Sequence, residues 1–230
     1  MRRRPQYTPN LLMTAVAALL LSGKPGLGQS GIVDPRTLCV PLEIHQGSPQ
    51  EKPCLNELRD AVERSGDTLT LKLGNGKTKV IRNSKECKDP AKEDECVSYA
   101  LVGYLGERYF LVDERPYECG SVLLIDRQTG EQTVLGGWPT LSPNKKRFVV
   151  TASAVSGECN PPYGTAIFSL KDDQPRVEWQ SQSPGDLEDF YYDGWDGDEH
   201  LFLRWEREGR HTRVQLKLTA QGWTSIPYIP

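Results

Sequence analysis

The chain has 230 residues, of which 37% are hydrophobic and 26% charged, and its net charge is −3 at pH 7. This length and composition fit one globular domain, or one domain with a small N-terminal appendage. Because an acidic protein repels phosphate groups, we expect neither nucleic acid nor an anionic membrane surface as a partner.

The first 28 residues have the pattern of an export signal. Three arginines follow Met1, an apolar run extends from Leu11 to Leu21, and small residues end at Gly28. The run is shorter than the roughly 20 apolar residues that span a bilayer. We therefore predict that residues 1–28 are removed and that the product is secreted or periplasmic, without membrane insertion. The alternative is a buried N-terminal helix, for which the rest of the chain offers no partner.

Six cysteines follow this signal: Cys39, Cys54, Cys87, Cys96, Cys119 and Cys159. An even number in an exported chain predicts disulfides, whereas a metal cage or a thiol nucleophile is not expected. No spacing is C-x-x-C, which argues against zinc-ribbon and thioredoxin-type sites. Cys87 and Cys96 stand at the two ends of a charged loop, and we predict that they pair with each other.

The N-terminal part of the predicted product contains one short helix. Residues 29–53 carry Pro and Gly with little periodicity and predict an extended lead-in. Leu55, Leu58, Ala61 and Val62 share one helical face, and Gly66 ends the pattern. We therefore assign residues 29–66 to the lead-in and helix, and residues 67–230 to a β domain.

After this helix the spacing of apolar residues changes from the helical period of 3.6 to the strand period of 2. Polar and apolar residues alternate over residues 68–73, Asn75-Gly76 favours a tight turn, and residues 77–81 would form the second strand. Together these features predict a hairpin.

From Tyr99 onward the sequence repeats. Three stretches, starting at Tyr99, Trp138 and Tyr191, each contain two short strands around a polar turn and are followed by a further hairpin. Aligning Phe110, Phe148 and Phe202 gives the repeat spacing. The sequence thus predicts a mostly β fold of repeated antiparallel four-stranded units with one short N-terminal helix.

Two motifs of the repeats resemble known blades. The segment LSPNKKRFVV resembles the turn between the first two strands of TolB-like and related β-propeller blades, and LLIDRQTGEQTVL resembles their third and fourth strands. The arrangement also resembles a group of uncharacterised exported bacterial proteins. The resemblance covers about residues 99–226 and implies a blade-like unit but no activity.

The aligned units lead to a prediction of the remaining disulfides and leave closure open. Cys119 and Cys159 occupy the same loop in adjacent units, so we predict that they pair, which leaves Cys39 with Cys54. Three units do not close a propeller. Either the hairpin at residues 68–82 supplies part of a fourth unit, or the units form an open stack whose edge the lead-in and helix cover.

No segment carries a recognisable catalytic, metal or cofactor motif. Gly74–Thr78 lacks the first glycine of a phosphate loop, and the acids Asp193, Asp196, Asp198 and Glu199 do not have calcium-loop spacing. His45, His200 and His211 are scattered, and there is no G-x-S-x-G elbow. We therefore expect neither a cofactor nor a metal. We predict that these residues have structural roles.

Aromatic residues in two cysteine-bearing loops are the remaining candidates. Tyr117 and Tyr163 are flanked by prolines in the loops of Cys119 and Cys159, and stiff loops with amphipathic rings are typical of recognition surfaces. An ordered, stapled loop has the same composition without any partner. Our first hypothesis is an exported, non-enzymatic interaction module with a protein partner. The alternatives are an envelope or extracellular hydrolase of polysaccharide or peptide, using acids such as Asp193, Asp196 or Glu199, and a secreted enzyme inhibitor.

Overall fold

The structure is a computed structural model that describes Cys39 and residues 51–117, 120–151, 165–171, 174–181, 189–207 and 210–227. Helix α1 spans Glu51–Glu57, and the short 3-10 helices η2 and η3 span Lys85–Lys88 and Pro90–Glu95. Strands β1 to β15 span, in order, Val62–Ser65, Thr68–Lys72, Thr78–Arg82, Ser98–Leu105, Tyr109–Arg115, Ser121–Asp126, Gln132–Leu135, Pro139–Leu141, Arg147–Val150, Ala166–Ser169, Arg176–Gln180, Asp189–Asp196, His200–Arg207, Arg210–Thr219 and Gly222–Pro227. None of the described helices is of a length and apolarity that would cross a membrane.

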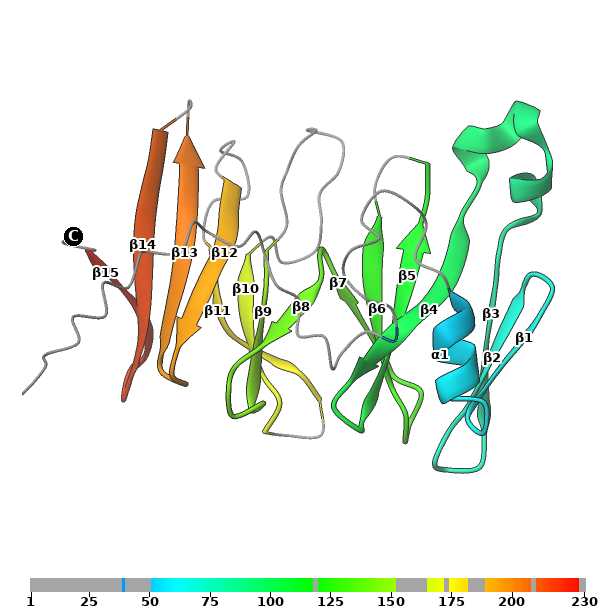
Figure 1. Ribbon diagram of the computed structural model, residues 1–230, viewed down its shortest axis with the longest axis horizontal. Helices are drawn as coiled ribbons and strands as arrows, with labels where there is room; N and C mark the ends of the chain where they lie inside the picture. Colours follow the sequence, from blue (N-terminus) through cyan, green and yellow to red (C-terminus); the bar gives the residue numbers. More distant parts are fainter. Residues whose placement is uncertain are drawn as a thin grey trace, which may run out of the picture.

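The strands form four antiparallel sheets that follow the chain. A three-stranded sheet, β1-β2-β3, precedes three four-stranded sheets, β4 to β7, β8 to β11 and β12 to β15, in which each strand pairs with the next. Figure 1 shows the sheets face to face in one row, with β1–β3 at one end and β12–β15 at the other. The predicted mostly β fold of repeated four-stranded units is confirmed, and the described sheets form an open row.

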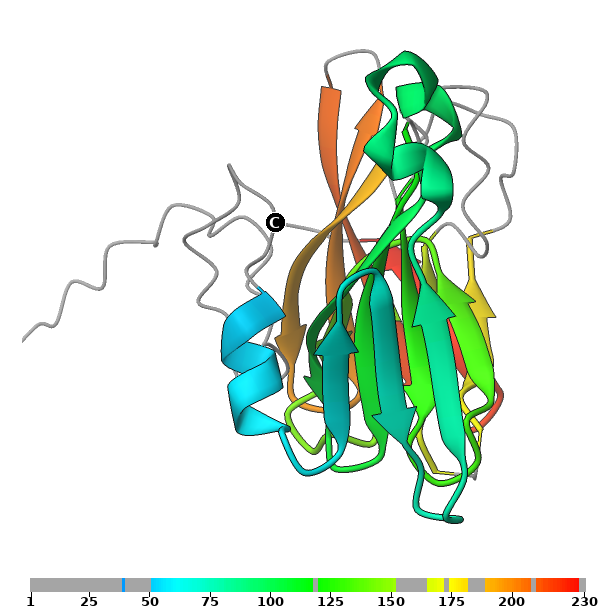
Figure 2. The same ribbon diagram turned by 90° about the vertical axis from the view of Figure 1, so that its right-hand side faces the viewer.

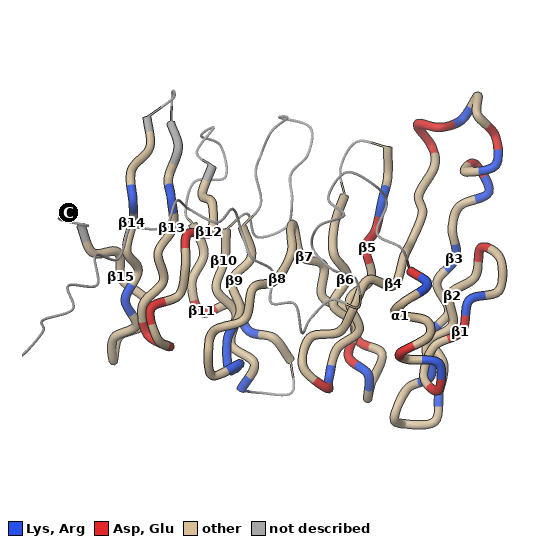
Figure 3. The backbone as a smooth tube through the Cα atoms, in the orientation of Figure 1, with Lys and Arg blue, Asp and Glu red and all other residues tan. Residues whose placement is uncertain are grey.

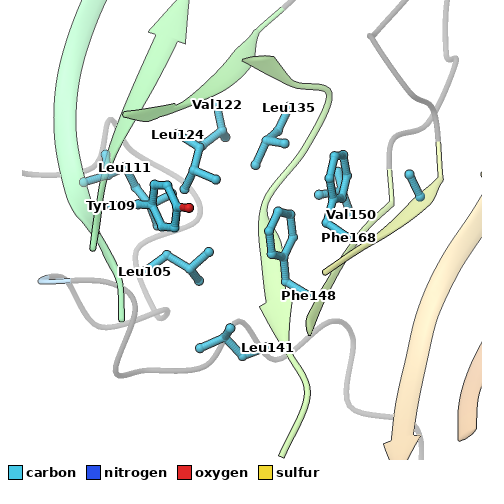
Figure 4. Packing of buried hydrophobic residues seen from close by; sticks show 12 residues of the cluster. Leu105, Tyr109, Leu111, Val122, Leu124, Leu135, Leu141, Phe148, Val150 and Phe168 are labelled. Atoms are coloured by element: carbon cyan, nitrogen blue, oxygen red, sulfur yellow. The ribbon is translucent and has the colours of Figure 1, made fainter. Parts of the chain in front are cut away.

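Each pair of neighbouring sheets encloses its own apolar core. The core between β4–β7 and β8–β11 contains Tyr109, Leu111, Phe148 and Phe168, with the two phenylalanine rings stacked at a centroid distance of 4.7 Å (Figure 4). A second core joins β1–β3 to β4–β7, and a third joins β8–β11 to β12–β15.

Strands in the middle of the row are apolar on both faces. Along β5, Tyr109 and Leu111 belong to one core, while Phe110 and Val112 belong to the next. Successive side chains of a strand point to opposite faces, so a continuous apolar run is what a sheet covered on both sides requires. Each of these four side chains is at most 3% exposed.

The three-stranded sheet corresponds to the last three strands of a unit. Its β2–β3 turn lies beside the β6–β7 turn, where Gly74 N donates a hydrogen bond to Arg127 O at 2.8 Å. Helix α1 contacts β1 and β4 and lies beside the β1 edge (Figure 2). The helix thus occupies the place at which a first strand would begin this unit.

The predicted extent of the helix is wrong. The helix ends at Glu57, and Val62, expected on its apolar face, begins strand β1 and pairs with Leu71. Gly66, with φ of +55°, forms the β1–β2 turn and does not end a helix. The sheet therefore begins at Val62, before the domain boundary expected at residue 67.

The predicted hairpin is confirmed, but one repeat alignment is wrong. Strands β2 and β3 flank the turn that contains Asn75 and Gly76, as expected. In the last sheet, however, Leu201 and Leu203 face the core, so Phe202 between them faces outward. Phe110 and Phe148 each face the preceding sheet, and their counterpart is therefore a leucine beside Phe202.

Candidate functional site

The candidate site lies at the rim where β5 ends. Tyr117 follows this strand and is 60% exposed, which makes it the most exposed of the large hydrophobic side chains among the described residues. The loop that carries it begins at Pro116 and is closed by the paired residues Glu114 and Ser121. The C-terminal end of β5 lies at the same rim of the row as the Cys87–Cys96 segment (Figure 1).

An ion pair supports one side of the loop. Arg115 Nε donates to Asp113 Oδ2, and the two side chains are 27% and 14% exposed. Burial raises the pKa of Asp113, although Arg115 favours its ionised form and acts in the opposite direction. Arg115 Nη2 is buried and has no hydrogen-bond partner in the described part of the chain. Residues 113 and 115 lie on the same face of β5, which ends two residues before Tyr117.

A hydrogen-bond network supports the other side. Glu114 accepts hydrogen bonds from the hydroxyls of Tyr99, at 3.0 Å, and Ser121. Burial, with the adjacent Glu114 carboxylate, raises the pKa of Tyr99, so its hydroxyl remains a donor at neutral pH. The two ends of the loop are therefore fixed to each other by side chains as well as by the β5–β6 ladder.

Two of the three predicted disulfides lie among the described residues, and both are present. Cys39 pairs with Cys54, with Cα atoms 4.8 Å apart, and Cys87 pairs with Cys96, at 4.6 Å. Cys119, Cys159 and Tyr163 lie outside the described residues. Disulfides such as the two observed belong to an oxidising compartment.

The charged Cys87–Cys96 segment is the most prominent charged feature of this rim. Lysines and acids follow one another along η2 and η3, whereas the middles of the strands carry few charges (Figure 3). Both short helices have no buried residue. We interpret the segment as a solvated loop that its disulfide keeps closed.

Two of the four acids considered for catalysis or cation binding have structural contacts. Asp193 forms an ion pair with Arg213 at 2.6 Å, and Asp198 Oδ1 accepts from Asn144 N at 2.8 Å. Asp196 and Glu199 are exposed. No group of three or more potential metal ligands occurs among the residues that the structure describes.

Two carboxylates that no sequence motif marks are held by hydrogen bonds, one buried and one half-buried. Asp126, fully buried, accepts from Arg108 Nε at 2.7 Å and from two backbone N–H groups of the following turn. Glu178 accepts both Arg147 Nε and the indole N–H of Trp223, at 2.6 and 3.0 Å. The second cluster links two sheets through residues 31 and 45 positions apart, a separation that no local pattern reveals.

Comparisons with protein-family models, with curated proteins and with solved structures find no match to this chain.

Proposed function

We propose that this chain is a secreted or periplasmic interaction module without enzymatic activity, and that it binds a protein partner through the rim around Tyr117. The four-stranded meanders act as blade-like supports, in line with the blade motifs of the sequence. The observation that carries the proposal is an aromatic side chain held 60% exposed on a loop whose two ends are fixed.

A preorganised loop would lower the entropic cost of binding a partner. An exposed ring loses water-accessible apolar area when a partner covers it, which is favourable. Ordering a loop opposes binding, but here the Glu114–Ser121 hydrogen bond already joins the two flanking strands, and the Asp113–Arg115 ion pair holds the end of β5. Tyrosine is enriched among the residues that dominate protein interfaces, whereas isolated exposed valines are common on any surface.

Site-specific photo-crosslinking tests the proposal. The oxidised chain from Gln29 carries a photoreactive phenylalanine analogue at position 117, or at position 80 as a control, and is exposed to periplasmic and culture fluids. Val80 suits the control because it is the exposed large hydrophobic residue of β3, at 47%. We expect a defined protein adduct from position 117 that position 80 does not give.

Binding of the purified adduct partner then decides the matter. Tyr117→Ala should weaken binding roughly 30-fold, as for a hot-spot aromatic, while Val80→Ala should change it less than about twofold. Far-UV circular dichroism and thermal melting establish that both variants fold. Equal binding by Tyr117→Ala and the unchanged chain, or equal loss in both variants, would contradict the proposal.

A further inference from the structure

The free edge of β4 is closed by side chains from other segments. Among the described strands, β4 pairs only with β5, so its other edge has no described strand beside it. At Tyr99, the backbone N–H donates to Asn83 Oδ1 at 2.9 Å, and the carbonyl accepts from Arg64 Nη2 at 2.7 Å. At Leu101, the backbone N–H donates to Glu51 Oε1 at 2.8 Å.

An ion pair and a disulfide hold these groups in place. Arg64 and Glu51 form a two-point pair, at 2.8 and 2.6 Å, with side chains 14% and 17% exposed. Further along the edge, the Val102 carbonyl accepts from Cys39 N at 3.2 Å. Cys39 is bonded to Cys54 of α1, which is fully buried in the core between the first two sheets. The disulfide therefore ties both Cys39 and α1, which carries Glu51, to the β4 edge.

The sequence of β4 contains nothing that would itself oppose strand pairing. Its eight residues, SYALVGYL, include neither a charge nor a proline. Exposed edge strands are usually protected by charged residues, prolines or a covering segment. Uncharged segments rich in β-branched and aromatic residues pair readily with copies of themselves. Apart from one β-bulge between Leu101 and Gly103, protection of this edge thus depends on the covering residues.

We propose that the Cys39–Cys54 disulfide is a strap that keeps the β4 edge closed, and that its reduction opens this edge to antiparallel pairing with β4 of a second copy of the chain. A dithiol reductant supplies the two electrons and two protons that convert the disulfide to two thiols, and itself becomes a disulfide. Cys39 is then free to leave Val102, and α1 loses its covalent tie. A second copy is the occupant because it brings the same uncharged strand, and two identical edges pair about a twofold axis.

The test compares two serine variants under oxidising conditions. Cys39→Ser/Cys54→Ser removes the strap, and Cys87→Ser/Cys96→Ser is the matched control, since it removes the other described disulfide but leaves Cys39, Cys54 and Glu51 unchanged. We expect amide hydrogen exchange at Leu101 to be at least about tenfold faster in the first variant than in the control. Sedimentation should show a concentration-dependent dimer in the first variant and a monomer in the control.

A third substitution examines the pairing itself. Tyr104→Lys, added to the strapless variant, places a charge in β4 and should restore the monomer while exchange at Leu101 stays fast. The proposal is overturned if the strapless variant stays monomeric, if its Leu101 exchange equals that of the control, or if Tyr104→Lys leaves the dimer intact. Protected amides in β13 and β14 establish folding. If the strapless variant does not fold, the Cys87→Ser/Cys96→Ser chain, folded first and then reduced by a dithiol, takes its place, and a monomer there overturns the proposal.

Discussion

Glu178 shows how a single carboxylate joins two sheets. It lies on β11, receives two hydrogen bonds from Arg147 of β9, and accepts the indole N–H of Trp223 from the last sheet. Burial alone raises the pKa of Glu178, but the donors from Arg147 and Trp223 outweigh it, and the pKa lies below its ordinary value. The ionised form is therefore the one that the fold stabilises.

We predict that Glu178→Gln lowers the free energy of unfolding by about 3 kcal/mol at neutral pH, because Arg147 is left buried without its counter-charge. Glu63→Gln on the exposed face of β1 should have almost no effect. Urea denaturation gives both values.

The pH dependence follows from the direction of the pKa shift. Since the folded pKa is lowered, the stabilisation is complete above the unfolded value of about 4.3 and is lost as pH falls through the folded pKa. The deficit of Glu178→Gln should therefore shrink in acid. A deficit that is constant from neutral pH to below the folded pKa would contradict the assigned role of the charge.

Residues of this kind could not be identified from the sequence. Arg147 and Glu178 are ordinary strand residues in their own segments, and only the sheet pairing brings them together. The same holds for the β4 edge, where Glu51 and Leu101 meet across 50 positions. Tyr117, in contrast, is exposed as its proline-flanked loop suggests, because that feature depends on local sequence.

At the scale of elements, the β2–β3 hairpin depends on its turn. Gly76 has a φ of +78°, a conformation that costs other residues about 1–2 kcal/mol. We predict that Gly76→Ala lowers stability by about 1 kcal/mol, measured by thermal and urea unfolding. Gly120→Ala is the control, since its backbone is not left-handed and the added Cβ meets Glu114 O at a normal 3.4 Å. Equal losses in both variants would show that the turn conformation is not the cause.

The strand pairs of the repeats could be predicted because each strand has either alternating polar and apolar residues or a continuous apolar run, and turn residues bound it. The helix could not be placed correctly, because the apolar spacing from Leu55 to Val62 fits a helical face as well as a helix followed by a strand. Tertiary contacts place Val62 in a strand. Val62 pairs with Leu71 and packs in the same apolar core as Leu69 and Leu71. Phe202 was misaligned because the register of a strand is set by its partners, and a shift of one residue reverses the face.

At the scale of the whole molecule, each sheet in the row packs only on its neighbours. In such an array, stability is a sum of unit and interface contributions, and the ends open before the middle. Leu203, fully buried between the last two sheets, belongs to one interface, whereas Leu111 belongs to the central one.

We predict that Leu203→Ala accelerates amide exchange in β12–β15 and leaves β5 and β6 protected, whereas Leu111→Ala accelerates exchange in both flanking sheets. Each substitution removes a buried leucine and should destabilise its interface by about 2–5 kcal/mol. Hydrogen exchange followed by mass spectrometry resolves the sheets. Uniform acceleration throughout the chain in Leu203→Ala would show a single cooperative unit instead.

The three four-stranded units could be predicted, but the choice between an open and a closed arrangement could not. The repeats predict units, but closure depends on the small rotation between neighbouring sheets, which side-chain packing determines. The three-stranded first sheet is a further obstacle, since α1 stands where a strand would start, and its sequence does not resemble the other units.

An open row also determines how the molecule would respond to force. Its described ends, α1 and β15, lie at opposite ends of the row (Figure 1), so tension applied through the termini acts along the direction in which the sheets are stacked. Sheets held by separate cores would detach one after another, each lengthening the chain by up to about 3.6 Å per released residue. A closed ring would resist such a pull until the contact between its first and last sheets broke. This open row would instead extend stepwise, one sheet at a time.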